Sequence, residues 1–174
     1  MKLLWGEDMN YIVDMLKRAL SKKACLKHPV AAVIETANQD YILGWNGAPT
    51  KGAEHLECLR KGQPHGVGMQ YCPTVHAERR AISHAARDGA KKGISLEGAI
   101  IYMSEWFPCA DCAKSIIEAG IEKIVTPDEF YQNRQERVLM PNLQNQPYNF
   151  EMAEKLLCEA GIKCVVDPSI RVVR

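Results

Sequence analysis

The sequence predicts an α/β layered domain built on a five-stranded mixed sheet. Short apolar runs alternate with segments of helical periodicity, in the order helix, strand, strand, helix, strand, helix, strand, helix, strand. Strands separated by helices favour parallel pairing with right-handed crossovers, whereas two adjacent strands favour an antiparallel hairpin. With 174 residues, of which 47% are hydrophobic, the whole of 1–174 is expected to form one globular domain with a sizeable core.

The first half of the chain predicts one helix and one hairpin. Residues 7–20 carry apolar side chains at helical spacing, and 30–36 is a compact apolar run typical of a buried strand. Turn residues at 38–40 lead into a second strand at 41–45. The segment 46–73 has no clear period and is expected to be irregular, and irregular segments of this length in compact domains are usually functional.

The second half predicts three helices that alternate with strands. Thr74 is expected to be the N-cap of the first of these helices, and glycines at 89, 120 and 161 are expected to end the three. A second irregular stretch, 126–147, is rich in Asn, Gln and Pro. The predicted elements are helix 75–88, strand 99–103, helix 109–119, strand 121–125, helix 150–160 and strand 162–166.

Composition and charge exclude several classes of protein. A net charge of +1, from 22 basic and 21 acidic residues, disfavours a broad polyanion-binding surface and hence nucleic acid as a partner. An odd number of cysteines, 7, favours a reducing compartment and a cytoplasmic protein. The apolar run Leu3–Trp5 is too short for a signal peptide, and no stretch approaches the roughly 20 apolar residues of a membrane span.

Two short motifs carry the chemistry. His76-Ala77-Glu78 and Pro108-Cys109-Ala110-Asp111-Cys112 together read H-x-E…P-C-x-x-C, the signature of zinc deaminases. His76, Cys109 and Cys112 would fill three positions of a tetrahedral zinc and leave the fourth for water, which is the pattern of a catalytic site. Both motifs are expected in the first turns of helices, whose partial positive charge favours thiolates, and Pro108 suits such a helix start.

The motifs also predict a mechanism. Zinc lowers the pKa of its bound water toward roughly 7, and Glu78 would move a proton from that water to the ring and then to the departing amine. Taken alone, the C-x-x-C could instead be a redox pair or half of a structural zinc site. His76 supplies a metal partner for Cys109, and the chain has no second C-x-x-C, so both alternatives are disfavoured.

With these motifs the chain resembles the cytidine deaminase superfamily, and more narrowly the deoxycytidylate (dCMP) deaminases. The similar segments are SKKACLKHPVAAVI (21–34), GWNGAP (44–49), the insertion that ends at Cys72 and continues into VHAERRAISHAAR, and FPCADCAKSIIEAGIEKIV (107–125). The resemblance implies a three-layer α/β/α fold and hydrolysis of dCMP to dUMP and ammonia, a reaction that feeds dTMP synthesis. It also implies that Asn46 hydrogen-bonds the sugar, that the backbone beside Ala77 reads the pyrimidine edge, and that the protein is a homo-oligomer, often a hexamer.

The chain departs from the family pattern at three places. Arg79-Arg80 stands where the family usually has x-Asn after His-Ala-Glu. The Cys that commonly follows Gly-x-Pro is absent, which disfavours a second, structural zinc and leaves regulation by dCTP and dTTP open. Tyr131 and Arg134 lie in the unexpectedly long stretch 126–147 and could cap the base or bind phosphate. The residues that could still hold a second zinc are Cys25, His84, Cys58, Cys72, His55 and His65.

Three alternatives to dCMP deamination stay open at this point. The altered Arg79-Arg80 could mark a base-modified nucleotide substrate. A deaminase acting on tRNA or single-stranded nucleic acid would need a basic channel, which the near-neutral charge disfavours. A zinc-bound subunit without turnover would have no use for Glu78.

Overall fold

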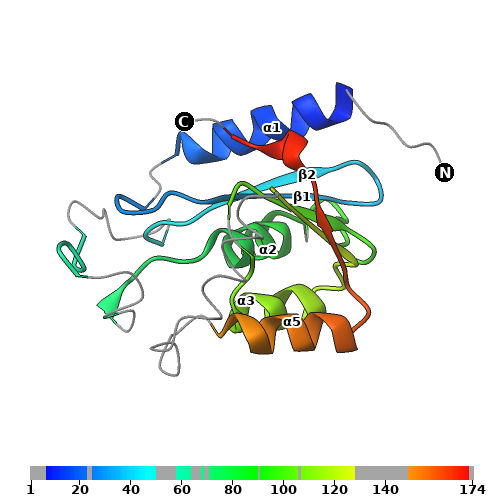
Figure 1. Ribbon diagram of the computed structural model, residues 1–174. Helices are drawn as coiled ribbons and strands as arrows, with labels where there is room; N and C mark the ends of the chain where they lie inside the picture. Colours follow the sequence, from blue (N-terminus) through cyan, green and yellow to red (C-terminus); the bar gives the residue numbers. More distant parts are fainter. Residues whose placement is uncertain are drawn as a thin grey trace.

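The computed structural model describes residues 7–22, 25–49, 58–63, 68, 71–89, 91–105, 107–127 and 149–172. Within them a sheet lies between two helical layers (Figure 1). Its strands are β1 (Ala31–Glu35), β2 (Tyr41–Trp45), β3 (Ile100–Met103), β4 (Lys123–Thr126) and β5 (Lys163–Val166). The helices are α1 (Glu7–Leu20), α2 (Ala77–Gly89), α3 (Ala110–Glu118), α5 (Phe150–Glu159) and the 3₁₀ turn η3 (Pro168–Ile170).

The strand order β2-β1-β3-β4-β5 makes a mixed sheet, as the sequence predicts. β1 and β2 form the expected antiparallel hairpin, and β1 also pairs antiparallel with β3. β3 and β4 are parallel, as are β4 and β5, because α3 and α5 carry the chain back across the sheet between them.

Two hydrophobic clusters separate the layers and confirm the three-layer α/β/α fold. Alternate residues of a strand face opposite sides of a sheet, so Ala31 and Val33 pack under α1 while Ala32 and Ile34 pack against α2. Figure 1 shows α1 and the short turn η3 on one face and α2, α3 and α5 together on the other. The turn η3, which the sequence did not suggest, contributes buried Ile170 to the α1 side.

Both helices that carry the motifs begin later than predicted. Thr74 does not cap α2, because the next residue, Val75, is held in a bridge to Gly47 with N–O distances of 2.8 and 3.2 Å. The helix therefore starts at Ala77, and the carbonyl of His76 accepts the first helical bond from Arg80 N at 2.9 Å. The other predicted elements end within about two residues of the observed bounds.

Helix α3 also begins later than predicted. Cys109 is the extended N-cap residue, and its carbonyl accepts from Ala113 N at 2.8 Å. Pro108 therefore lies just outside the helix and not at its first position. As a result His76 and Cys109 both occupy the residue immediately before a helix, where the first N–H groups of that helix point.

Gly44 allows α2 to approach the sheet closely enough to form the site. A Cβ at this position would lie 2.1 Å from the carbonyl oxygen of Ala77 and 2.8 Å from Cβ of Ala81. Only glycine permits this contact, so the Gly44-Trp45-Asn46 motif has a packing role as well as a role in the pocket.

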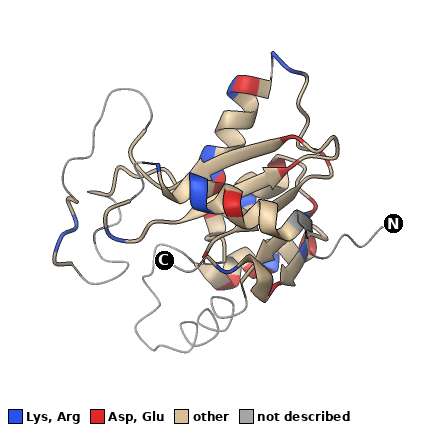
Figure 2. Cartoon of the chain, turned by 90° about the horizontal axis from the view of Figure 1, so that it is seen from above, with Lys and Arg blue, Asp and Glu red and all other residues tan. Residues whose placement is uncertain are grey.

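Surface charge is mixed on the side of the molecule that carries α1. Basic and acidic residues are interspersed there and do not form a face of one sign (Figure 2). None of the helices that the structure describes is long and apolar enough to cross a membrane.

Candidate active site

His76, Cys109 and Cys112 converge at the starts of α2 and α3. Their ligand atoms lie within 4.8 Å of one another, and Nδ1 of His76 is 3.6 Å from Sγ of Cys109 and 3.3 Å from Sγ of Cys112. A nitrogen and a sulfur bound at tetrahedral angles to one zinc lie about 3.6 Å apart. The donor types and their spacing therefore fit a zinc ion with three protein ligands and one open position.

When no metal is bound, the three ligand side chains differ in their protonation states. A hydrogen bond from Cys112, assisted by His76, lowers the pKa of Cys109 to about 4. The hydrogen bond to Cys109 raises the pKa of His76 to about 9, with the charge of Glu78 assisting. The pKa of Cys112 is raised by its hydrogen bond with Cys109 and by burial. The site therefore holds a thiolate, an imidazolium and a thiol near pH 7.

Glu78 lies beside this ligand set in the first turn of α2. Its side chain is only 5% exposed, and burial raises the pKa of the carboxyl above its usual value. A carboxyl whose protonated form is favoured in this way is suited to accept and return a proton. It lines the same pocket as His76 and Cys109 and is placed where a proton shuttle would act.

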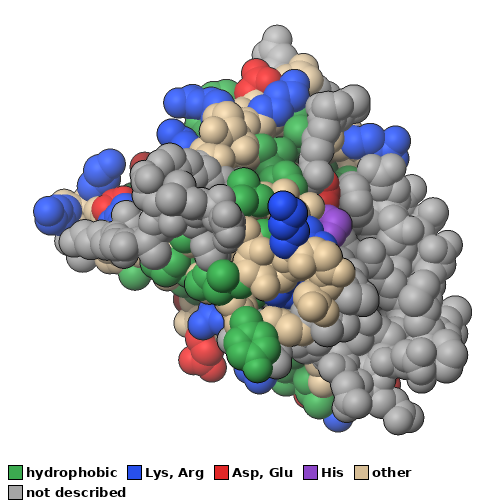
Figure 3. Space-filling model, turned by 90° about the vertical axis from the view of Figure 1, so that its left-hand side faces the viewer, with side chains coloured by type: hydrophobic (Ala, Val, Ile, Leu, Met, Phe, Trp, Pro, Cys, Tyr) green, Lys and Arg blue, Asp and Glu red, His purple; other side chains and the backbone are tan. Residues whose placement is uncertain are grey.

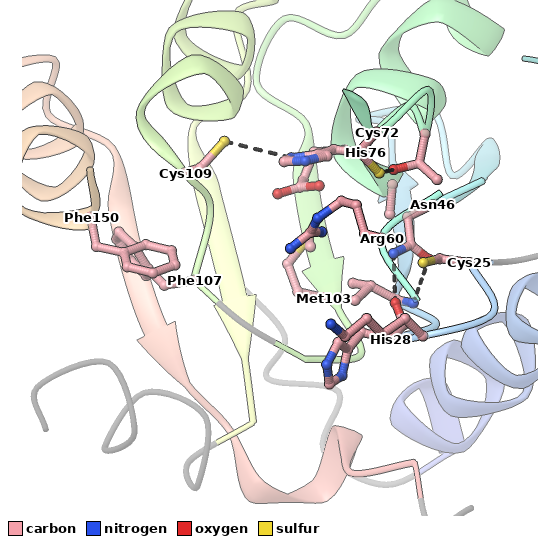
Figure 4. A pocket seen from close by; sticks show the side chains of 15 residues that line it. Cys25, His28, Asn46, Arg60, Cys72, His76, Met103, Phe107, Cys109 and Phe150 are labelled. Carbon is pink, nitrogen blue, oxygen red and sulfur yellow. Dashed lines mark hydrogen bonds between the residues drawn. The ribbon is translucent and has the colours of Figure 1, made fainter. Parts of the chain in front are cut away.

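The pocket that these residues line is drawn in Figure 4. It holds about 710 Å³ of space not filled by atoms, its open mouth included. Met103, Phe107 and Phe150 give it an apolar wall, and the side chain of Arg60 lies between His76 and His28 in this view. An apolar cleft with a few convergent polar groups is the usual form of a small-molecule site.

The predicted substrate residues Asn46 and Ala77 both line this pocket. The amide of Asn46 accepts from Val30 N at 2.7 Å and donates to the carbonyl of His28 at 2.6 Å. These bonds use one of the two N–H groups of the amide, so the other can meet a hydroxyl of a ligand. The carbonyl oxygen of Ala77 faces Gly44. The backbone groups that can contact a ligand at the start of α2 are therefore the N–H groups of its first turn.

Several residues outside the motifs also line the pocket, and the sequence pattern did not identify them. Arg60 is the most notable, since its side chain is buried although it comes from the irregular segment 46–73. A lone basic residue without periodicity or motif carries no sequence signal that would distinguish it from a surface residue.

The residues considered for a second zinc do not form a second ligand cluster. His76, Cys109 and Cys112 are the single such group in the described part of the chain. Nδ1 of His84 lies 2.8 Å from the carbonyl oxygen of Leu43, which gives that histidine a structural role. Cys25, Cys58 and Cys72 line a smaller neighbouring pocket. Four residues singled out in the sequence lie outside the described residues: His55, His65, Tyr131 and Arg134.

Arg80, which departs from the expected family pattern, contacts the scaffold of the pocket. One of its terminal nitrogens donates to the carbonyls of Gly47 at 2.7 Å and Ala48 at 2.6 Å. The guanidinium also lies over the ring of Trp45. Arg80 therefore holds the loop that follows Asn46 against α2.

A His/Cys/Cys ligand set with a buried glutamate beside it, on helix starts above a mixed sheet, defines a zinc-dependent hydrolytic enzyme. The family model described as "Cytidine and deoxycytidylate deaminase zinc-binding region" matches residues 7–127. The chain belongs to this family of cytidine and deoxycytidylate deaminases, and its metal site is a zinc site.

Individual relatives agree with this assignment. The deoxycytidylate deaminase of Mycobacterium phage D29 is 31% identical over 132 residues, which cover 72% of this chain and 95% of the relative. That of Enterobacteria phage T4 is 43% identical over 145 residues, which cover 63% and 72%. The mouse enzyme is 29% identical over 106 residues, and the match covers 61% of this chain but only 56% of that longer protein.

A solved structure shares the fold. The dCMP deaminase of cyanophage S-TIM5, in complex with dCMP and dUMP, superimposes with a TM-score of 0.61 at 20% identity. The match covers 96% of this chain and 99% of that one.

Proposed function

We propose that this protein is a zinc-dependent hydrolase that converts dCMP to dUMP and ammonia. The observation that carries the proposal is the juxtaposition of the His76, Cys109 and Cys112 ligand set with buried Glu78 in one pocket. The names of the phage and animal relatives support deoxycytidylate as the substrate. The product, dUMP, is the precursor of dTMP, so the reaction would feed thymidylate synthesis.

We propose a role in this reaction for each of the predicted site residues. His76, Cys109 and Cys112 would hold the zinc, which would supply Lewis-acid activation of the attacking water. Glu78 accepts one proton of the attacking water and donates it to N3 of the pyrimidine; it then accepts the proton of the new hydroxyl at C4 and donates that proton to the leaving amino group. One water enters and one ammonia leaves, so the C–N bond is replaced by a carbonyl. Asn46 positions the sugar, and the start of α2 at Ala77 contacts the pyrimidine edge.

The experiment is ammonia release from zinc-loaded protein supplied with dCMP, CMP, deoxycytidine, dCTP, 5-methyl-dCMP and dAMP. Glu78→Gln is expected to keep zinc and lose at least about a hundredfold in turnover, because the proton shuttle is removed. Glu118→Gln, at an exposed position on α3, is the matched control and should turn over normally. Equal turnover by Glu78→Gln, or no turnover of any cytosine nucleotide, would refute the proposal.

The proposal also includes the assembly, the regulation and the location of the protein. The resemblance to the family supports a homo-oligomer, with a hexamer expected, and control by dCTP and dTTP. Seven cysteines without disulfides, two of them zinc ligands, support a reducing, cytoplasmic location. Sedimentation of the purified protein, with and without each nucleotide, tests the assembly and the effectors.

A further inference from the structure

Three cysteines outside the zinc site line one small cavity beside the active-site pocket. The cavity holds about 430 Å³ of space not filled by atoms, its open mouth included, and its cysteines are Cys25, Cys58 and Cys72. All three are free thiols, and all three are half-buried, so each is partly shielded and still reached by solvent. The proposed deamination uses none of them.

Cys72 forms part of the wall between this cavity and the active site. It lines the active-site pocket as well as the smaller cavity, whereas Cys58 lines only the smaller one. Its Sγ lies 3.0 Å from Oγ1 of Thr74, a hydrogen bond that Figure 4 marks at the edge of the pocket. A group added to the sulfur of Cys72 therefore changes the wall of the active-site pocket.

The surroundings of Cys72 favour the thiolate. Burial opposes ionisation of the thiol, yet hydrogen bonds with Thr74 and Arg60 hold its pKa below the usual value. The positive charge of Arg60 acts in the same direction, and Lys27 lines the same two pockets. Cysteines that oxidise readily are partly exposed, have thiolate character and lie near a second cysteine. Cys72 meets all three conditions.

The three thiols come from segments that are far apart in the chain and meet on one side of the molecule. Figure 1 shows residues 58–63 and 71–75 at the left, and Figure 3 turns this side toward the viewer. Basic and hydrophobic side chains intermingle on that surface. The backbone N–H of Cys25 donates to the carbonyl of Asn46 at 2.7 Å. A covalent bond formed at Cys25 would therefore act on the backbone of the residue proposed to position the sugar.

We propose that these cysteines form an oxidation switch, in which Cys72 reacts with a hydroperoxide and a second thiol of the same cavity, Cys25 or Cys58, then forms a disulfide with it. In the first step the thiolate attacks one peroxide oxygen and the O–O bond breaks. The sulfur is oxidised to a sulfenic acid, and the other oxygen leaves as water after taking up a proton. In the second step the other thiolate attacks this sulfur, the S–O bond breaks, and the hydroxide leaves as water after protonation.

Oxidation should switch off nucleotide binding and leave the zinc in place. The disulfide removes the hydrogen bonds of Cys72 with Thr74 and Arg60, and both of these residues line the active-site pocket. The zinc ligands Cys109 and Cys112 are buried, so an oxidant reaches them more slowly. The switch is therefore distinguished by inactivation that a dithiol reverses and that precedes any loss of zinc.

The first test needs no turnover. The starting protein is zinc-loaded and carries Cys158→Ser and Cys164→Ser, which remove two exposed thiols. It is treated with hydrogen peroxide, alkylated, digested and examined by mass spectrometry. A disulfide that joins Cys72 to Cys25 or Cys58 and disappears in dithiothreitol is expected. Cys72 that stays reduced while other cysteines oxidise would overturn the proposal.

The second test measures activity and rests on the proposed function. Peroxide should lower kcat/KM for dCMP at least about tenfold in the starting protein, and dithiothreitol should restore it. Cys72→Ser in the same background should keep its activity under peroxide. Each activity is divided by that of the same protein before treatment, because Cys72 lines the pocket and its replacement can change the basal rate. A chromogenic chelator follows zinc release in the same samples.

Two further results would overturn the proposal. Inactivation that persists in Cys72→Ser, or that follows zinc release, would assign the oxidation to Cys109 and Cys112. A second zinc held by the thiols of the small cavity, with protection from peroxide, would assign those thiols to a metal. Neither result affects the proposed deamination, which is measured on untreated protein. A failure of deamination would in turn leave the mass-spectrometric test unchanged.

Discussion

The guanidinium of Arg80 lies 4.9 Å above the centre of the Trp45 ring. The same side chain donates to the carbonyls of Gly47 and Ala48 and is only 3% exposed. One residue of α2 therefore holds both the end of β2 and the loop that follows Asn46. Arg80 therefore clamps one wall of the pocket.

Replacing Arg80 should loosen this wall. Arg80→Gln is expected to reduce the free energy of unfolding by about 2–3 kcal/mol, because a cation–π contact and two charge-assisted hydrogen bonds are lost. KM for dCMP should rise more than kcat falls, since the altered loop carries Asn46 and not Glu78. Urea unfolding and steady-state kinetics measure the two effects. Arg79→Gln, on the exposed side of α2, is the control, and a similar loss there would contradict the assignment.

Gly44 should tolerate no side chain. Gly44→Ala places a Cβ 2.1 Å from the carbonyl oxygen of Ala77, so α2 must move away from β2. We expect destabilisation of at least about 3 kcal/mol and reduced zinc content, because His76 directly precedes the displaced helix. Gly93→Ala is the control. It has open space around the new Cβ but a positive φ of 68°, so it should cost only about 1 kcal/mol.

Zinc binding should require Cys112 and should release protons. Cys112→Ser is expected to lose zinc, whereas Cys164→Ser, at an exposed cysteine, should retain it. Binding to the metal-free protein near pH 7 should release about two protons, from the imidazolium of His76 and the thiol of Cys112. Metal analysis and calorimetry in buffers of different ionisation enthalpy provide the measurements.

The same analysis decides the number of metal ions. We expect one zinc per chain. A stoichiometry of two would contradict this expectation and direct attention to the pocket lined by Cys25, Cys58 and Cys72.

Glu78 should make the stability of the metal-free protein depend on pH. Because burial raises its pKa in the folded state, the stabilisation is complete below the unfolded pKa near 4.5 and is lost as pH rises through the folded pKa. Glu78→Gln removes this loss. The variant should exceed the original protein in stability by at least about 1 kcal/mol at pH 8, with the difference vanishing near pH 4. Thermal unfolding across this range tests it, and a constant difference would contradict the burial argument.

The strand and helix order could be predicted because it rests on local periodicity. Residues 7–20 form α1 and 41–45 form β2 with the predicted bounds, since the apolar spacing in each is regular. The start of α2 could not be predicted. Thr74 has the chemistry of an N-cap, but Val75 pairs with Gly47, which is distant in sequence, and that pairing delays the helix until Ala77.

The chemistry of the zinc site was determined by the sequence alone. The zinc motif can be recognised from residue type and spacing, because few other arrangements of these groups provide ligands for one metal together with one proton shuttle. Its residues are His76, Glu78, Cys109 and Cys112. What only the tertiary structure decided is the rest of the pocket. The burial of Arg60 and the contacts of Arg80 depend on which segments fold beside them. The function of a buried charged side chain depends on the groups that surround it, and those groups come together only when the chain folds.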